Sequence, residues 1–293
     1  MNYFERLHPV SAFAYFVAVL LVAMLTMHPV IVAVCFLSGV WFCGMLIGIR
    51  KLLGSLAYTL PILLLITLTN PIFVHKGETI LFFLNDNPFT LEALIYGGVA
   101  ALMLLSVFYW CRCYTEIMTE DKFLYLFGKA LPKLSLVLTM TLAFVPRMKR
   151  KWQAIDEAQA ALGIYATDSY WDRIRGKFRV LSVLLTDCLE ASVDTADSMR
   201  ARGYGLPNRS NSRSCRFTLS DGLYLLFTLL LGTGCVVLIV MGTADFQYYP
   251  MVSKVETEGL FCVLYCVLIL FAGGPIFMEV KENIQWRYLR SKI

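Results

Sequence analysis

Residues 144–163 read FVPRMKRKWQAIDEAQAALG, and residues 171–205 read WDRIRGKFRVLSVLLTDCLEASVDTADSMRARGYG. Charged side chains recur in both segments at helical spacing, and Asp187, Glu190 and Asp194 draw one polar face on the second. The rest of the chain is strongly apolar. The two stretches therefore predict a pair of helices of soluble character, set inside a membrane protein and offering a surface to other proteins.

The ends of these two predicted helices are related. Thr167-Asp168-Ser169 is expected to cap the second helix at its start, near Trp171, and glycines 203 and 205 are expected to end it. Gly163 ends the first helix in the same way. Alignment of the two stop glycines sets Ala161-Leu162-Gly163 against Ala201-Arg202-Gly203.

Composition identifies the class of protein. The chain has 293 residues, 58% of them hydrophobic, and a mean hydropathy of +0.65. Such apolarity indicates a polytopic membrane protein. The net charge of +5 arises from one region, about residues 112–216. Because this basic block lies beside apolar spans, we interpret it as a topology signal and expect no nucleic-acid partner.

Six apolar runs are each close to the length that crosses a bilayer. They cover roughly residues 10–27, 30–49, 56–74, 91–110, 219–241 and 259–278. A seventh run, about 134–145, is too short to span and is bracketed by Pro132 and Pro146, where we expect the helix to break. The stretch 75–90 is predicted as polar loop.

Basic loops set the expected orientation. With these loops on the cytoplasmic side, both termini lie in the cytoplasm and the loops near residues 28, 80 and 250 lie outside. The predicted fold is all-α and polytopic, with about six transmembrane helices and a cytoplasmic helical insert. We expect an N-terminal membrane region over 1–111, the insert over 112–218 and a C-terminal membrane region over 219–293.

No catalytic or metal-binding constellation is visible in the sequence. The cysteines and histidines lack metal-site spacing, and there is no Walker-type glycine loop. We therefore expect a non-catalytic protein without a cofactor or bound metal. A membrane-embedded enzyme and a stand-alone secondary carrier are the alternatives. The scarcity of ionisable residues inside the spans argues against a carrier. Glycines 39, 44 and 48 are expected to let helices pack closely.

Arg202 has two interpretations. Between alanine and glycine it can stabilise its own helix end through the helix dipole, with Gly203 as the stop residue. Alternatively, its guanidinium can project from a slim helix end and bind a carboxylate of a partner in bidentate fashion. The tripeptide alone leaves both open.

The longer pattern resembles a known family. LPKLSLVLTMTLAFVPRM (131–148), AIDEAQAALG (154–163) and DTADSMRARGYG (194–205) are similar to the transmembrane T component of energy-coupling factor transporters. The resemblance implies that two Ala-Arg-Gly signatures at the ends of coupling helices dock on ATPases. Arg202 then holds the second signature, with Arg200 as an added positive charge. At the first signature Leu162 replaces the expected arginine, which leaves that contact open.

The resemblance also implies partners and location. They are two ABC-type ATPase subunits, a substrate-binding membrane subunit and the bilayer of a prokaryotic plasma or inner membrane, and the cargo is a vitamin or a transition-metal ion. The second coupling helix carries an apolar stripe that either packs against its own chain or also cradles the substrate-binding subunit. The stripe comprises Ile174, Phe178, Leu181, Leu184, Leu185, Leu189 and Val193.

Overall fold

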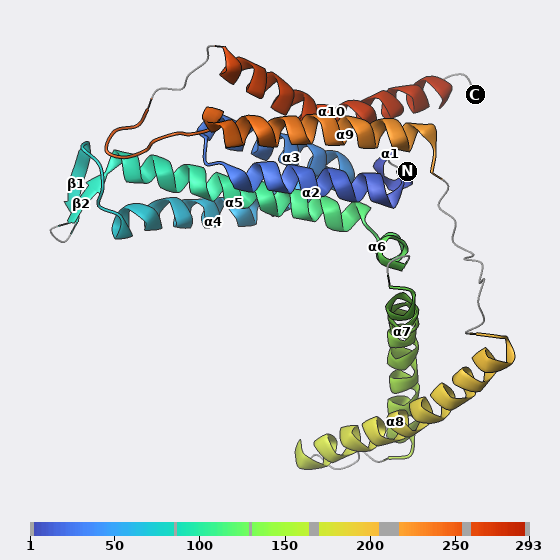
Figure 1. Ribbon diagram of the computed structural model, residues 1–293. Coiled ribbons are helices and arrows are strands. Elements are labelled where there is room, and N and C mark those ends of the chain that lie inside the picture. The colour runs from blue at the N-terminus through green and yellow to red at the C-terminus, as the bar shows by residue number, and fades with distance from the viewer. Residues whose placement is uncertain are drawn as a thin grey trace. The chain divides into compact units, whose positions relative to one another are not determined.

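Helices make up nearly all of the structure, a computed structural model that describes residues 3–84, 87–128, 131–163, 170–204, 217–253 and 259–290. The chain forms two compact units (Figure 1). The first combines residues 1–123 with 215–293, and the second covers residues 124–214. The short helix α6, Glu120–Gly128, crosses the boundary between them.

The first unit is a bundle of long apolar helices that run alongside one another (Figure 1). A single helical turn, α1, precedes them. The helices and their bounds are α1 Tyr3–Arg6, α2 Pro9–Leu25, α3 Pro29–Ile47, α4 Ile49–Phe73, α5 Leu91–Ile117, α9 Leu219–Leu238 and α10 Leu260–Arg290. A π-helical segment, Ile239–Thr243, continues α9.

Among the described residues, five helices are long and apolar enough to cross a membrane. They are α3, α4, α5, α9 with its π-helical extension, and α10 as far as Trp286. The sixth predicted span is the shorter apolar helix α2, of 17 residues. The prediction of an all-α polytopic membrane protein is therefore confirmed.

Aromatic side chains fill the middle of the first unit. Phe4, Tyr15, Phe42, Trp110 and Tyr224 are almost completely buried and meet mostly edge to face. The indole nitrogen of Trp110 donates a hydrogen bond to the carbonyl of Cys35 at 3.0 Å. Buried aromatic rings with a satisfied polar group combine a large buried area with defined geometry. They join helices from both ends of the sequence into one core.

The three glycines of α3 and its end differ in role. A Cβ on Gly39 would lie 3.0 Å from the Trp110 ring, and one on Gly44 would lie 2.9 Å from the Leu52 side chain. These two glycines permit close packing, as predicted. The prediction is wrong for Gly48, where a Cβ would meet nothing within 4 Å. Its φ of +91° instead makes the turn from α3 into α4, a conformation that glycine adopts without strain.

The segment predicted as a polar loop contains a β-hairpin. Strand β1, Ile80–Leu84, pairs antiparallel with β2, Asn87–Thr90, and the rings of Phe82 and Phe89 stack at 4.6 Å. At the start of α5, Glu92 accepts hydrogen bonds from the backbone N–H and the hydroxyl of Thr79. The run ILFFL is a strong strand former, and the turn residues around it obscured that signal.

Two acidic residues of the span helices lie at helix starts. Glu92 is the second residue of α5, and Asp221 is the third residue of α9. Asp221 completes a capping box with Thr218 and also accepts a hydrogen bond from the backbone N–H of His8 at 3.0 Å. Each carboxylate thus holds a helix start in place.

The second unit consists mainly of two long helices, α7 Pro132–Ala161 and α8 Tyr170–Ala201. Pro132 is the first helical residue of α7, where proline loses no hydrogen bond. The predicted break at Pro146 is wrong, because α7 continues through it. The apolar residues before Pro146 and the charged residues after it both favour a helix, which outweighs the missing hydrogen bond at the proline.

Candidate functional site

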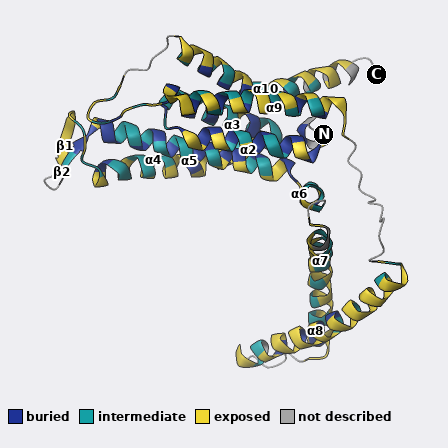
Figure 2. Ribbon diagram, viewed as in Figure 1, coloured by how far each residue is buried: buried dark blue, intermediate teal, exposed yellow. Residues whose placement is uncertain are grey.

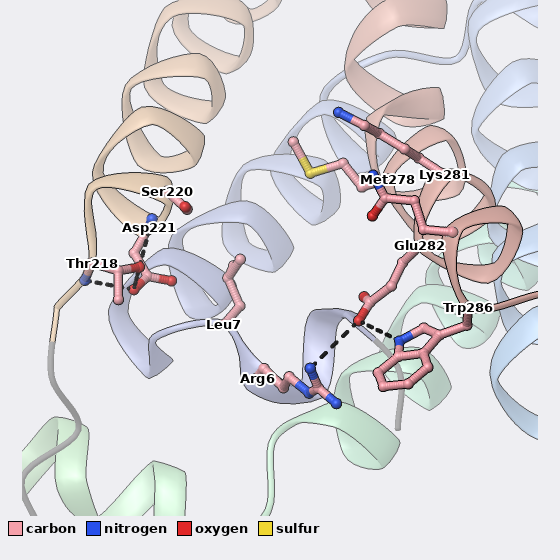
Figure 3. Close-up of a pocket in the computed structure, with 10 residues that line it drawn as sticks. Arg6, Leu7, Thr218, Ser220, Asp221, Met278, Lys281, Glu282 and Trp286 are labelled. Carbon is pink, nitrogen blue, oxygen red and sulfur yellow. Dashed lines mark hydrogen bonds and ion pairs between the residues drawn. The ribbon is translucent and has the colours of Figure 1, made fainter. Parts of the chain in front are cut away.

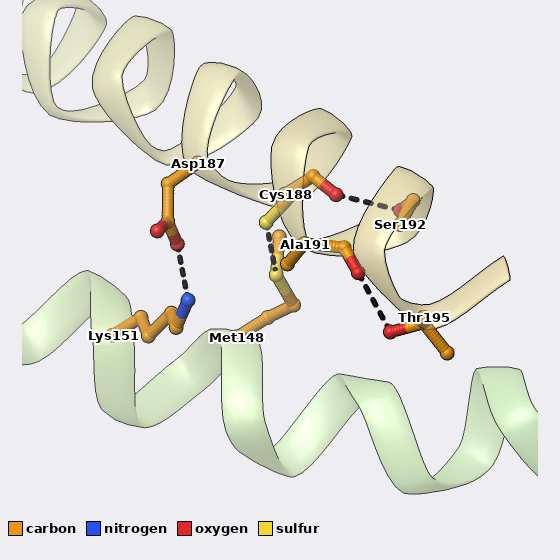
Figure 4. A network of polar contacts seen from close by, with 7 residues as sticks. All are labelled: Met148, Lys151, Asp187, Cys188, Ala191, Ser192 and Thr195. Carbon is orange, nitrogen blue, oxygen red and sulfur yellow. Dashed lines mark hydrogen bonds and ion pairs between the residues drawn. The ribbon is translucent and has the colours of Figure 1, made fainter. Parts of the chain in front are cut away.

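The site is built on the contact between α7 and α8. The α8 side chains Val180, Leu184 and Cys188 are buried, and they recur every four residues along one face. Cys188 contacts the sulfur of Met148 on α7 (Figure 4). Beside it, the ammonium of Lys151 donates to the Asp187 carboxylate, and this hydrogen bond raises the pKa of Lys151. An apolar contact with one ion pair at its edge fixes how the two helices pack.

A second apolar face of α8 is exposed. Phe178, Leu181, Leu185 and Leu189 follow one another at intervals of three and four residues, and all are exposed. Much of the α8 ribbon carries the colour of exposed residues (Figure 2). Among the residues of the predicted stripe, only Leu184 is buried against the unit. Among the described residues, the stripe therefore separates into a buried inner face at Leu184 and an exposed outer face. Large apolar faces of this kind mark interaction surfaces.

Both helices end at a glycine with a left-handed φ. At the end of α8, the N–H of Gly203 donates to the carbonyl of Arg200, and the N–H of Tyr204 donates to that of Met199. This pair of bonds is a Schellman motif, which requires the left-handed φ of +73° found at Gly203. At the end of α7, the N–H of Gly163 donates to the carbonyl of Ala160, with φ of +72° at the glycine.

The two left-handed glycines put Leu162 and Arg202 at equivalent positions. Each is the last residue before its stop glycine, and each is preceded by an exposed alanine, Ala161 or Ala201. The two helix ends are thus slim, and each presents one large side chain. The sequence alignment of the two triplets agrees with this geometry.

The large side chains at the two ends are open to solvent. Leu162 is 77% exposed, an unusual position for a leucine. Arg200 and Arg202 are exposed as well, and within the described residues neither guanidinium forms an ion pair. Arg202 borders a small hollow of 290 Å³, together with Asp194, Ser198 and Tyr204. Its charge is free to bind a carboxylate on another protein.

Sequence reasoning missed a groove between α7 and α8. Its volume is 560 Å³, and it is lined by Met140, Met148 and Met199 together with Phe144 and the stem of Lys151. Methionines adapt their shape to different partners, so a groove rich in them suits a surface that moves. Their scattered positions at 140, 148 and 199 give no sequence motif, although spacing of eight on α7 is helical.

Some predicted features fall outside the described residues. These are the proposed cap Thr167-Asp168-Ser169 and the glycine at 205. In the part of the chain that the structure does describe, no group of three or more His, Cys, Asp or Glu side chains could hold a metal ion.

Comparison with known proteins supports one family. No protein-family model matches the sequence. The energy-coupling factor transporter transmembrane protein EcfT of Listeria innocua is 27% identical over 179 residues, which cover 56% of this chain and 66% of that protein. The protein of the same name from Thermosediminibacter oceani is 26% identical over 218 residues, 70% of this chain and 79% of its own length. The chain is thus similar to T components over more than half of its length.

The chain spans slightly less than two thirds of the length of the Listeria innocua protein. Both names describe a membrane subunit of a transporter rather than an enzyme. The similarity agrees with the five candidate spans found among the described residues and with the mainly helical architecture.

Proposed function

We propose that this chain transmits the motion of two ABC-type ATPases to a separate substrate-binding membrane subunit, and so drives import of a vitamin or a transition-metal ion. The α7–α8 unit faces the cytoplasm in this proposal, as the basic residues of 112–216 favour. ATP hydrolysis belongs to the partners. The chain itself acts as a non-catalytic scaffold in a prokaryotic plasma membrane.

The observation that carries the proposal is the pair of matching helix ends. A helix that ends in alanine, one large residue and a left-handed glycine presents a narrow tip, which fits a groove on another protein. Two such tips in one unit match two ATPase subunits. At the α8 tip, Arg202 supplies the specific contact through a bidentate bond to a carboxylate, and Arg200 adds positive charge beside it.

The α7 tip works differently in this proposal. Leu162 lies where the family pattern has arginine, and its side chain is 77% exposed. A partner that covers this leucine stabilises the complex through the hydrophobic effect. Full burial of a leucine stabilises a complex by about 1.5–3 kcal/mol. We infer that the first ATPase receives the Ala161-Leu162-Gly163 tip in an apolar groove, so the two ATPase contacts differ in chemistry.

The outer face of α8 is the proposed seat of the substrate-binding subunit. Its three leucines and one phenylalanine form an exposed apolar surface of the kind that marks interaction sites. A tilt of α8, driven by the ATPases at its end, would then move the bound subunit directly. The cargo is selected by that subunit and not by this chain.

Co-purification with the candidate ATPases tests the docking role. Arg202→Glu places like charges together at the second contact, and loss of such a charged pair typically costs about 2–5 kcal/mol. The expected result is at least a 30-fold weaker ATPase affinity, because about 1.4 kcal/mol corresponds to ten-fold. Leu162→Asp should weaken binding by about ten-fold, whereas Leu162→Met should leave it intact.

Arg150→Glu is the matched control, because Arg150 is an exposed arginine of the same unit away from both tips. It should bind ATPases normally. Wild-type affinity and ATP-driven uptake in the Arg202→Glu variant would refute the docking role. Transport by the purified chain in vesicles without any ATPase would instead support a secondary carrier, and turnover of a substrate would support an enzyme.

A further inference from the structure

A polar pocket of 620 Å³ lies in the first unit, where the end of α1, the start of α9 and the last turns of α10 meet (Figure 3). It borders the end of a span, because the apolar run of α10 gives way to charged residues after Met278, which lines the pocket, and Trp286 of the same helix lines it as well. Tryptophan is enriched at the boundary between hydrocarbon and water. The pocket therefore lies at the level of lipid headgroups.

Two cations and two carboxylates line this pocket: Arg6, Lys281, Asp221 and Glu282. Asp221 is fully occupied, because it accepts hydrogen bonds from the N–H and hydroxyl of Thr218 and from the N–H of His8. These contacts hold the start of α9. Asp221 is therefore part of the wall, and the remaining charges are available to a ligand.

Glu282 has one carboxylate oxygen that lacks a partner among the described residues. Its Oε1 lies 3.7 Å from the Arg6 guanidinium and 3.4 Å from the Trp286 indole nitrogen, both long contacts. Its Oε2 is buried and has no hydrogen-bond partner among the described residues, and the side chain as a whole is 16% exposed. A buried carboxylate oxygen without a donor is costly. Within the described residues, Oε2 of Glu282 is therefore open to a donor from a ligand.

We propose that the pocket binds the headgroup of a phospholipid that carries a primary ammonium next to its phosphate. The ammonium donates to Oε2 of Glu282, and the phosphate pairs with Lys281 and Arg6, since charge-assisted bonds to phosphate and carboxylate are the strong ones. The acyl chains continue along the apolar face of α10 that begins at Met278, which also lines the pocket. The bound lipid ties the end of α1 to α10.

The charge balance favours this headgroup over others. The charges of the four side chains cancel. A purely anionic lipid would therefore place its negative charge near the Glu282 carboxylate with no positive charge of its own to offset the repulsion. Phosphatidylcholine has the same net charge as phosphatidylethanolamine, but its methylated ammonium offers no N–H donor. A primary ammonium carries three donors, as a lysine does. The distinguishing contact is thus the hydrogen bond to Glu282.

The test measures lipid binding to the full chain, purified in detergent and stripped of lipid, by native mass spectrometry and by the shift of the unfolding temperature. The probes are phosphatidylethanolamine, phosphatidylcholine, phosphatidylglycerol and water-soluble phosphoethanolamine. Phosphatidylethanolamine is expected to bind about ten-fold more tightly than phosphatidylcholine, equivalent to about 1.4 kcal/mol. Glu282→Gln should remove that difference, while Glu116→Gln, an exposed glutamate at the end of α5, should keep it.

Equal binding of phosphatidylethanolamine and phosphatidylcholine would overturn the proposal. So would tighter binding of phosphatidylglycerol, which would mark a site for anionic lipid. If free phosphoethanolamine binds as tightly as the lipid, the ligand is a soluble phosphate monoester and the membrane source is wrong. Should Glu282→Gln fail to fold, the ranking of lipids on the wild-type chain still decides the outcome.

Discussion

Leu184 and Leu185 are neighbours of the same residue type with opposite surroundings. Leu184 is 4% exposed and lies on the face of α8 buried in the second unit, whereas Leu185 is 52% exposed on the outer face. Replacement of each by alanine therefore separates packing within the chain from binding to a partner. The two variants change helix propensity equally, so this term cancels.

The two substitutions are expected to reduce the stability of the second unit by very different amounts. A buried Leu→Ala change loses the transfer free energy of the side chain and leaves a cavity, at a cost of about 2–4 kcal/mol. The half-exposed Leu185 loses about 0.5 kcal/mol or less, as surface positions do. A cost of about 2 kcal/mol raises the opening constant of the α7–α8 contact roughly 30-fold, against about two-fold for Leu185→Ala.

Amide hydrogen exchange over residues 177–190 of the full chain in detergent measures these opening constants. Leu184→Ala should accelerate exchange of this segment strongly, and Leu185→Ala should barely change it. In binding to a substrate-binding subunit the order should reverse, with Leu185→Ala the more damaging. Equal acceleration by both variants would refute the division of α8 into an inner and an outer face.

Three further predictions follow from single positions. Gly97→Ala should destabilise the first unit by about 1–3 kcal/mol in thermal unfolding, because the added Cβ would lie 2.8 Å from the Thr67 carbonyl. Gly98→Ala should be tolerated, because the nearest atom to its Cβ would lie 3.9 Å away. Equal losses of stability in the two variants would contradict this prediction. Gly203→Ala should reduce stability by about 1 kcal/mol, because alanine is strained at the positive φ of this position. The end of α8 should then fray, and its amides should exchange faster. Unchanged exchange at the end of α8 would count against the described turn. Burial lowers the pKa of His28, so the stability that neutral His28 contributes is present above its ordinary pKa of 6.5 and is lost as pH falls through the lowered value. The unfolding temperature should therefore fall in acid, and His28→Gln should remove part of that fall. A pH profile of the unfolding temperature that the substitution leaves unchanged would refute the assignment.

Much of the fold was predictable because membrane spans give strong local signals. The six apolar runs match six helices, and the stop glycines 163 and 203 ended the two charged helices as expected, since only the left-handed φ of glycine suits that turn. The errors came from single residues read in isolation. Pro146 predicted a break, yet the sequence on both sides of it sustained the helix.

Other features depend on contacts between distant segments, which sequence patterns do not display. The apolar stripe of α8 was visible, but its division into a buried and an exposed face depends on where α7 lies. The sequence does not show that one oxygen of Glu282 lacks a partner, because the residues around this side chain, Arg6 and the start of α9, are far away along the chain. The hairpin at 80–90 was hidden by the turn residues around it.

Site-specific photo-cross-linking tests most directly whether the two helix tips dock on ATPases. A photoreactive phenylalanine analogue is placed singly at 162, 202 or the control position 150, in cells that express the chain with its candidate ATPases. The account predicts adducts between this chain and an ATPase subunit from positions 162 and 202, and none from 150. Absence of ATPase adducts from both tips, or equal labelling from position 150, would contradict it.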